Sequence, residues 1–125
     1  MTRGALLFDL DGTLTDPREG ITRCLQHALE TIGAAVPGER ELQRWIGQPL
    51  QQSLRSHLGA NNEALVDKGI AAYRERFAAI GMFENVVYAE IPAALAELKA
   101  SGWAMFVATS KPSLFARQTV EHFGL

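Results

Sequence analysis

The hydrophobic and polar positions of this chain form two strand-like apolar runs that enclose a long helical stretch. Residues 5–8 are continuously apolar, have no helical spacing and are followed by a glycine-containing turn, a pattern that predicts a buried strand. Residues 103–108 form a second run of the same kind. Because neither run is interrupted by polar residues, we expect both strands to be buried on both faces of a parallel sheet.

The segment between the two runs has apolar residues at the three- and four-residue spacing of helices. A first helix is expected with Asp16 as its N-cap, Pro17 at its first position and Gly33 at its end. Three more helices are expected around residues 42–46, 50–58 and 62–80. Residues 16–81 are therefore predicted to form an all-helical block.

The C-terminal part of the chain returns to alternating elements. A helix that begins at Pro92, with Leu95 and Leu98 facing inward, precedes the second apolar run. Another helix follows that run, and its expected inward residues and terminal glycine are Leu114, Phe115, Thr119, Val120, Phe123 and Gly124. The order strand, helix, strand, helix is typical of an α/β protein with a parallel sheet.

Two carboxylates directly follow the first apolar run. Asp9 and Asp11 are two residues apart, so in extended backbone their side chains would point to the same side. Gly12 allows the chain to turn and keeps backbone N–H groups nearby. Close like charges favour a bound divalent cation, and Mg²⁺ suits oxygen ligands and phosphate. The alternative is an ordinary turn, in which Asp and Gly are common.

A second polar cluster, Thr109-Ser110-Lys111, follows the second apolar run and comes shortly before a predicted helix. In parallel sheets, ligands bind at the carboxyl ends of the strands, so the two clusters are expected at the same rim. The Thr109 hydroxyl and the Ser110 backbone could hold a phosphate oxygen there. A simple helix cap is the alternative for Thr109. For Lys111 a solvated side chain is favoured over one that leans toward the anion.

Composition narrows the class of protein. The 125 residues are 47% hydrophobic and 21% charged, with a net charge of −2, which predicts a globular chain without a membrane span. The absence of a basic block argues against a polymeric nucleic acid partner. The single cysteine, Cys24, cannot form an internal disulfide and is expected to be a packing residue on the apolar side of a helix. No signal peptide precedes the first strand, and both observations favour a cytoplasmic location. The remaining candidates, His27, His57 and His122, are interpreted as ordinary helix residues.

The segment Phe8-Asp9-Leu10-Asp11-Gly12-Thr13-Leu14 resembles the first motif of the haloacid dehalogenase-like hydrolase superfamily, and most of all that of its phosphoglycolate phosphatases and 5′-nucleotidase-like phosphatases. The resemblance implies a Mg²⁺-dependent phosphomonoester hydrolase that acts on a small-molecule phosphate ester. Asp9 would be the nucleophile that becomes an aspartyl-phosphate, and Asp11 the general acid and then the base. Mg²⁺ would be held by Asp9 and Asp11, or by Asp9 and the backbone carbonyl of Leu10.

The resemblance also assigns the phosphate-binding groups and the domains. Thr109 and Ser110 match the second motif, and with Gly12 they would bind the phosphoryl group. Residues 1–15 and 82–125 would form a Rossmann-like core, incomplete in this chain, and residues 16–81 an inserted helical cap. Arg44 and Gln48 are possible specificity contacts of that cap, although ordinary surface positions are the default interpretation.

One departure from the superfamily pattern concerns the C-terminal side. The third motif, which supplies a lysine, and the fourth, which supplies acidic residues for the metal, normally lie beyond the position that matches Leu125. Two strands alone also form a marginal sheet with an open edge. We therefore hypothesise that the chain is a part of a longer phosphatase. A phosphomutase, or a phosphate- and Mg²⁺-binding fragment without turnover, are the alternatives.

Overall fold

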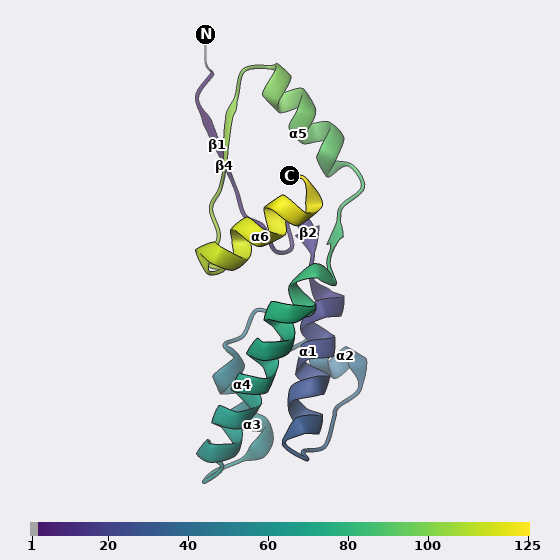
Figure 1. The fold of residues 1–125 in the computed structure, drawn as a ribbon, viewed down its shortest axis with the longest axis vertical. Helices are drawn as coiled ribbons and strands as arrows, with labels where there is room; N and C mark the ends of the chain where they lie inside the picture. Colours follow the sequence, from purple (N-terminus) through teal and green to yellow (C-terminus); the bar gives the residue numbers. More distant parts are fainter. Residues whose placement is uncertain (1–2) are drawn as a thin grey trace. The chain divides into compact units, whose positions relative to one another are not determined.

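The computed structural model describes residues 3–125, and the chain divides into two compact units (Figure 1). One unit contains the chain up to Pro17 together with Asn85–Leu125, and the other consists of Arg18–Glu84. These boundaries lie a few residues later in the chain than those expected from the sequence.

The first unit is built on two parallel strands. Strand β1 (Ala5–Phe8) pairs with β4 (Ala104–Val107), with Ala5 opposite Ala104 and Phe8 opposite Val107. Helix α5 (Ile91–Ala100) precedes β4, and helix α6 (Ser113–Phe123) follows it. The predicted α/β class with a parallel sheet is therefore confirmed.

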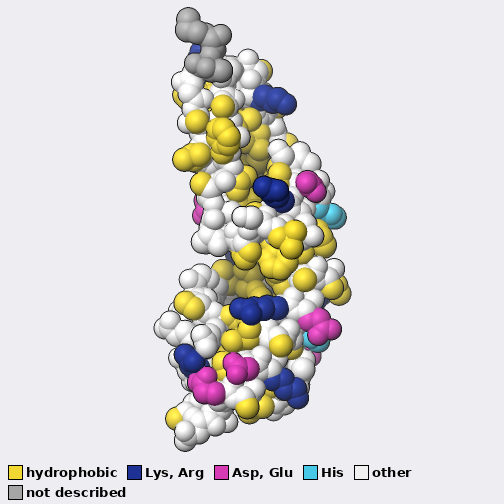
Figure 2. Space-filling model, turned by 60° about the vertical axis from the view of Figure 1, so that its left-hand side comes forward, with side chains coloured by type: hydrophobic (Ala, Val, Ile, Leu, Met, Phe, Trp, Pro, Cys, Tyr) yellow, Lys and Arg dark blue, Asp and Glu magenta, His cyan; other side chains and the backbone are white. Residues whose placement is uncertain are grey.

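The expectation that both strands are buried on both faces is wrong for the described residues. Side chains alternate between exposed and half-buried along β1, and Leu7 is 69% exposed; on β4, Phe106 is 55% exposed. The half-buried Phe8 packs against a small core of Leu10, Leu14 and Ala116. The described chain thus supplies cover for one side of a two-stranded sheet, and apolar side chains reach the surface over the upper part of the space-filling view (Figure 2).

A short antiparallel pair in the same unit was not predicted. Strand β2 (Thr15–Asp16) pairs with β3 (Val86–Val87), with Thr15 opposite Val87. These strands have two residues each, which is too short for the alternation of apolar and polar residues that identifies a strand in a sequence. Asp16 therefore ends a strand, and Pro17 lies between it and the first residue of α1, Arg18.

The second unit is helical, as predicted. Its helices are α1 (Arg18–Thr31), α2 (Glu39–Gln43), α3 (Leu50–Leu58) and α4 (Glu63–Ala79), followed by the 3₁₀ turn η1 (Gly81–Phe83). The second helix lies earlier in the chain than expected, because the chain forms turns from residue 44 onward. The core of this unit consists of Leu25, Leu29, Leu42, Leu54 and Val66.

Helix α1 and the 3₁₀ turn approach each other closely through two glycines. A Cβ atom placed on Gly20 would collide with the backbone oxygen of Gly81 and lie 2.9 Å from that of Glu84. The Gly20 N–H donates to the Glu84 carbonyl at 3.0 Å. Cys24, one turn further along α1, is fully buried, as predicted. Burial raises the pKa of its thiol, and a hydrogen bond from Arg76 partly offsets this.

The inward faces of the last two helices differ in part from those expected. On α6 the buried residues are Ala116 and Thr119, whereas Leu114 is 65% exposed, because the part of the chain that is described provides nothing to cover it. Leu95 and Leu98 of α5 are only half-buried. Helix α6 ends at Gly124 in the left-handed conformation (φ +69°), as the sequence predicts.

Candidate active site

The turn after β1 is fixed by backbone hydrogen bonds. The carbonyl oxygen of the buried Leu10 accepts the N–H groups of Thr13, Leu14 and Thr15 at 3.0–3.2 Å. Gly12 has a φ of +80°, which favours glycine, and its N–H donates to the Thr15 carbonyl at 2.7 Å. The chain therefore reverses immediately after the strand, as predicted for Gly12.

The two carboxylates of this turn have different surroundings. Asp9 is exposed, and its Oδ1 accepts the backbone N–H of Leu10 at 2.8 Å. The Asp11 side chain is 35% exposed, and its Oδ1 lies 3.2 Å from Nζ of Lys111. Asp9 thus presents a carboxylate to solvent, while Asp11 is held by a cation from the other end of the chain.

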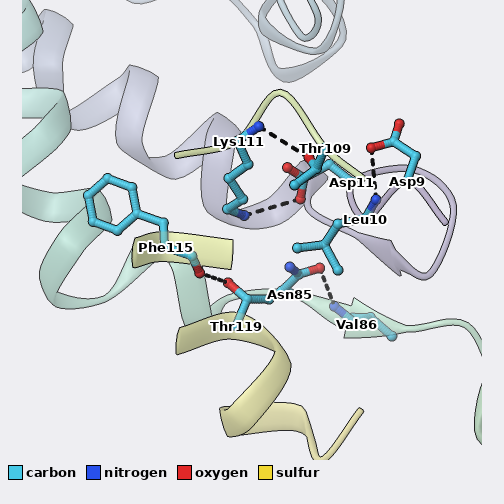
Figure 3. Close-up of polar contacts among 9 residues, drawn as sticks. All are labelled: Asp9, Leu10, Asp11, Asn85, Val86, Thr109, Lys111, Phe115 and Thr119. Atoms are coloured by element: carbon cyan, nitrogen blue, oxygen red, sulfur yellow. Dashed lines mark hydrogen bonds and ion pairs between the residues drawn. The ribbon is translucent and has the colours of Figure 1, made fainter. Parts of the chain in front are cut away.

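The second cluster lies beside Asp11 (Figure 3). The backbone ladder between β1 and β4 continues through the Ala108 N–H, which donates to the Phe8 carbonyl at 2.7 Å. The half-buried Thr109 follows, and its Oγ1 accepts the Lys111 N–H at 3.1 Å. The N-cap of α6 is Pro112, so the helix-cap interpretation of Thr109 is wrong. Its hydroxyl can still donate its own proton to an anion.

The exposure of the Lys111 side chain differs from the exposure expected from the sequence. Its side chain is only 7% exposed, so the interpretation as a solvated side chain is wrong. A buried ammonium requires a partner of opposite charge, and Asp11 provides one. The sequence feature that could have indicated a role in the site is the position of Lys111 two residues after Thr109. Its distance to Asp11 depends on the pairing of β1 with β4, which the hydrophobic pattern of the chain does not define.

The two polar clusters therefore meet at one rim of the sheet, as the parallel topology predicts. Asp11 and Lys111 are separated by 100 positions in the sequence and lie within hydrogen-bond distance in the structure. A cavity of about 400 Å³ is lined by Thr109 and Lys111 together with residues of β4 and α6. Ser110 is exposed next to them.

The donors at this rim fit a magnesium ion only in part. Mg²⁺ is commonly bound by one or two carboxylates, with water and substrate phosphate as further ligands, and Asp9 and Asp11 can supply those carboxylates. The Leu10 carbonyl is a poor ligand in this conformation, because three backbone N–H groups already occupy it. Among residues 3–125 no group of three or more His, Cys, Asp or Glu side chains could hold a metal. A complete protein cage is therefore not formed by these residues.

The remaining candidates lie in the helical unit or on α6 and make ordinary contacts. His57 is hydrogen-bonded to the Ala35 carbonyl at 2.8 Å and packs against the Trp45 ring, and His122 packs against Phe123. Arg44 and Gln48 are exposed. Within the described part of the chain, no helix has the length and apolar character needed to cross a bilayer.

An α/β unit with carboxylates after one parallel strand and a threonine after its neighbour defines a class of proteins that bind charged ligands at the carboxyl ends of the strands. Within that class, the chain belongs to the haloacid dehalogenase-like hydrolase family, whose profile matches residues 6–125.

Individual relatives agree with this assignment. A 5′-nucleotidase of Pseudomonas aeruginosa is 48% identical over 118 residues, which cover 94% of this chain and 53% of that protein. The tyrosine-protein kinase PtkA of Mycobacterium tuberculosis is 39% identical over 96% of this chain and 40% of its own length. A phosphoglycolate phosphatase of Colwellia psychrerythraea is 24% identical, over 96% of this chain and 56% of its own.

Solved structures show the same fold. A predicted phosphatase from Clostridium acetobutylicum has a TM-score of 0.80 and 41% identity, and covers 98% of this chain and 56% of its own. A haloacid dehalogenase-like family protein of Streptococcus pneumoniae has a TM-score of 0.85 at 26% identity, with 96% and 55% covered. The chain spans about half the length of the curated relatives it matches.

Proposed function

We propose that this chain contributes the nucleophile and the proton-transfer group of a phosphatase that hydrolyses small-molecule phosphate monoesters. The observation that carries the proposal is the meeting of Asp11 with Thr109 and Lys111 at the rim where Asp9 also lies. Membership in a hydrolase family supports it.

In the proposed reaction the exposed Asp9 carboxylate attacks the phosphorus atom and forms an aspartyl-phosphate, while the ester oxygen leaves. Asp11 enters this step protonated and donates that proton to the leaving oxygen; as a carboxylate it then accepts one from the water that releases phosphate. The Thr109 hydroxyl hydrogen-bonds to the phosphoryl oxygens. A Mg²⁺ ion on Asp9 and Asp11 would neutralise charge on those oxygens.

The identities favour a nucleoside monophosphate as substrate over phosphoglycolate. The relative named 5′-nucleotidase is 48% identical, whereas the one named phosphoglycolate phosphatase is 24% identical. The leaving group would be read by the helical unit of residues 18–84, which we propose acts as a cap. The exposed Arg44 and Gln48 are its candidate contacts.

Turnover is proposed to require residues that the described chain does not supply. Asp9 and Asp11 give an incomplete set of metal ligands, and β1 and β4 leave apolar side chains exposed. We therefore propose that the 125 residues are the nucleophile-bearing part of a longer enzyme. This agrees with the coverage of about half of each relative.

The test compares two proteins: the 125-residue chain, and the same chain joined to the part of the P. aeruginosa 5′-nucleotidase that follows the matched region. Release of phosphate from adenosine monophosphate and phosphoglycolate is measured with and without Mg²⁺. We expect hydrolysis by the joined protein only, with Mg²⁺, and a loss of at least about 1,000-fold in Asp9→Asn. Equal hydrolysis by Asp9→Asn would contradict the assignment of the nucleophile.

A further inference from the structure

Lys111 places a positive charge inside the candidate site, from a position that the proposed mechanism does not use. Its side chain is 7% exposed, and its Nζ lies 3.2 Å from Asp11 Oδ1. We propose that Lys111 is a positioning residue, which holds the Asp11 carboxylate beside Thr109 and attracts the phosphoryl group to that rim. The part of this inference that concerns phosphate rests on the proposed function. The contact between Lys111 and Asp11 is independent of it.

The backbone explains how Lys111 reaches this place. Its N–H donates to Thr109 Oγ1 at 3.1 Å, which closes a short turn at the end of β4. Pro112 follows in an extended conformation (φ −53°, ψ 137°) and α6 begins at Ser113. Thr109 and Lys111 are thus fixed relative to each other by one hydrogen bond, and both line the same cavity.

The burial of the Lys111 side chain strengthens its ion pair with Asp11. An ion pair between exposed side chains is weak, because water and salt screen it. Here the ammonium is largely removed from water while the Asp11 carboxylate remains 35% exposed. The ammonium contacts one carboxylate oxygen of Asp11, Oδ1. This contact restricts the rotation of the Asp11 side chain, which would be freer if both of its oxygens were only solvated.

The charges at the rim show how the Lys111 ammonium would favour phosphate binding. Before Asp11 takes up the proton that it transfers, Asp9 and Asp11 bring two negative charges and Lys111 brings one positive charge. With a divalent cation bound, the rim carries a net positive charge and attracts a phosphate dianion. Without Lys111 the same rim would be neutral, so phosphate would bind more weakly.

The contact is tested first without any ligand, by ¹⁵N NMR of lysine ammonium groups in the 125-residue chain. We expect one slowly exchanging ammonium signal, which disappears in Lys111→Gln and shifts in Asp11→Asn. Lys99→Gln, which alters an exposed lysine of the same unit, should leave that signal unchanged. A protected signal that does not respond to Asp11→Asn, or the absence of any protected signal, would overturn the proposal.

The role is tested with inorganic phosphate and Mg²⁺, both for binding to the 125-residue chain and as an inhibitor of the joined protein. We expect Lys111→Gln to weaken phosphate binding about tenfold or more, and to lower kcat as well as raise KM, with partial rescue by Lys111→Arg. Lys99→Gln should behave like the unaltered chain. Equal phosphate binding by Lys111→Gln and the unaltered chain, or no binding by either, would overturn the proposal.

The two proposals fail in different ways. If Asp9→Asn retains full hydrolysis, the proposed function is wrong, while the Lys111 ammonium signal and its response to Asp11→Asn are unaffected. If hydrolysis depends on Asp9 but Lys111→Gln changes neither kcat, KM nor phosphate binding, the positioning role of Lys111 is wrong and the proposed function stands.

Discussion

The guanidinium of Arg76 donates a hydrogen bond to the carboxylate of Glu84 at 2.6 Å, and their side chains are 18% and 17% exposed. The same nitrogen atom donates to Cys24 Sγ at 3.3 Å. Arg23 approaches the other Glu84 oxygen at 3.4 Å. Glu84 is the last residue of the helical unit, so this group ties the end of that unit to α1 and α4.

Replacement of Arg76 should destabilise the helical unit. The hydrogen bond to Glu84 raises the pKa of the Arg76 guanidinium, so the group is charged wherever the protein is folded. Arg76→Met removes the shorter of the two ion pairs that residues 3–125 form with Glu84 and leaves the longer contact to Arg23. We expect a loss of about 1–3 kcal/mol in the free energy of unfolding, measured by urea denaturation. Arg74→Met, at an exposed position of the same helix, is the matched control and should change stability little.

Cys24 should make the stability fall at alkaline pH. Burial raises the pKa of its thiol in the folded state, so the unfolded chain loses this proton first as the pH rises. The contribution is therefore complete below the ordinary thiol pKa of about 8.5 and is lost above it. We expect the decline in unfolding free energy between about pH 8 and about pH 10 to be steeper in the unaltered chain than in Cys24→Ala. Parallel curves for the two proteins would contradict this.

The contact between α1 and the 3₁₀ turn should not tolerate a methyl group. A Cβ on Gly20 would collide with the Gly81 backbone oxygen, and backbone cannot move aside as a flexible side chain can. We expect Gly20→Ala to lower the free energy of unfolding by about 2 kcal/mol or more. Gly38→Ala is the control, since a Cβ there meets nothing within 4 Å. Equal stability of the two variants would show that the close approach is absent.

The two kinds of leucine in the chain should respond differently to truncation. Leu54 is fully buried in the core of the helical unit, and Leu54→Ala is expected to cost about 2–5 kcal/mol of unfolding free energy. Leu114, on α6, is mostly exposed. Leu114→Ala should therefore cost little in the 125-residue chain. A large loss there would mean that Leu114 is covered in solution.

Most elements could be predicted because their signals are local. The four-residue spacing of Leu25 and Leu29 defines the buried face of α1, and the glycines that follow α3 and α6 are in the sequence. The exposure of Leu7 and Phe106 could not be predicted in this way. An uninterrupted apolar run indicates burial on both faces, but the covering elements must be present for that burial to occur.

In the candidate site, too, the residues with a local sequence signal could be predicted, and those that depend on distant contacts could not. Asp9, Asp11 and Thr109 are recognisable because each follows a strand-like apolar run. The buried position of Lys111 depends on the pairing of β1 with β4, a contact between segments far apart in the chain. The Leu10 carbonyl was expected as a metal ligand, but the tight turn uses it for three backbone hydrogen bonds.

The most direct measurement is the identification of the phosphorylated residue. The joined protein is incubated with Mg²⁺ and adenosine monophosphate and quenched in acid, and its peptides are analysed by mass spectrometry before and after hydroxylamine treatment. We predict one phosphoryl group on Asp9, removed by hydroxylamine and absent in Asp9→Asn. A phosphoryl group on another residue, or hydrolysis by Asp9→Asn at the unaltered rate, would contradict the central claim that Asp9 is the nucleophile.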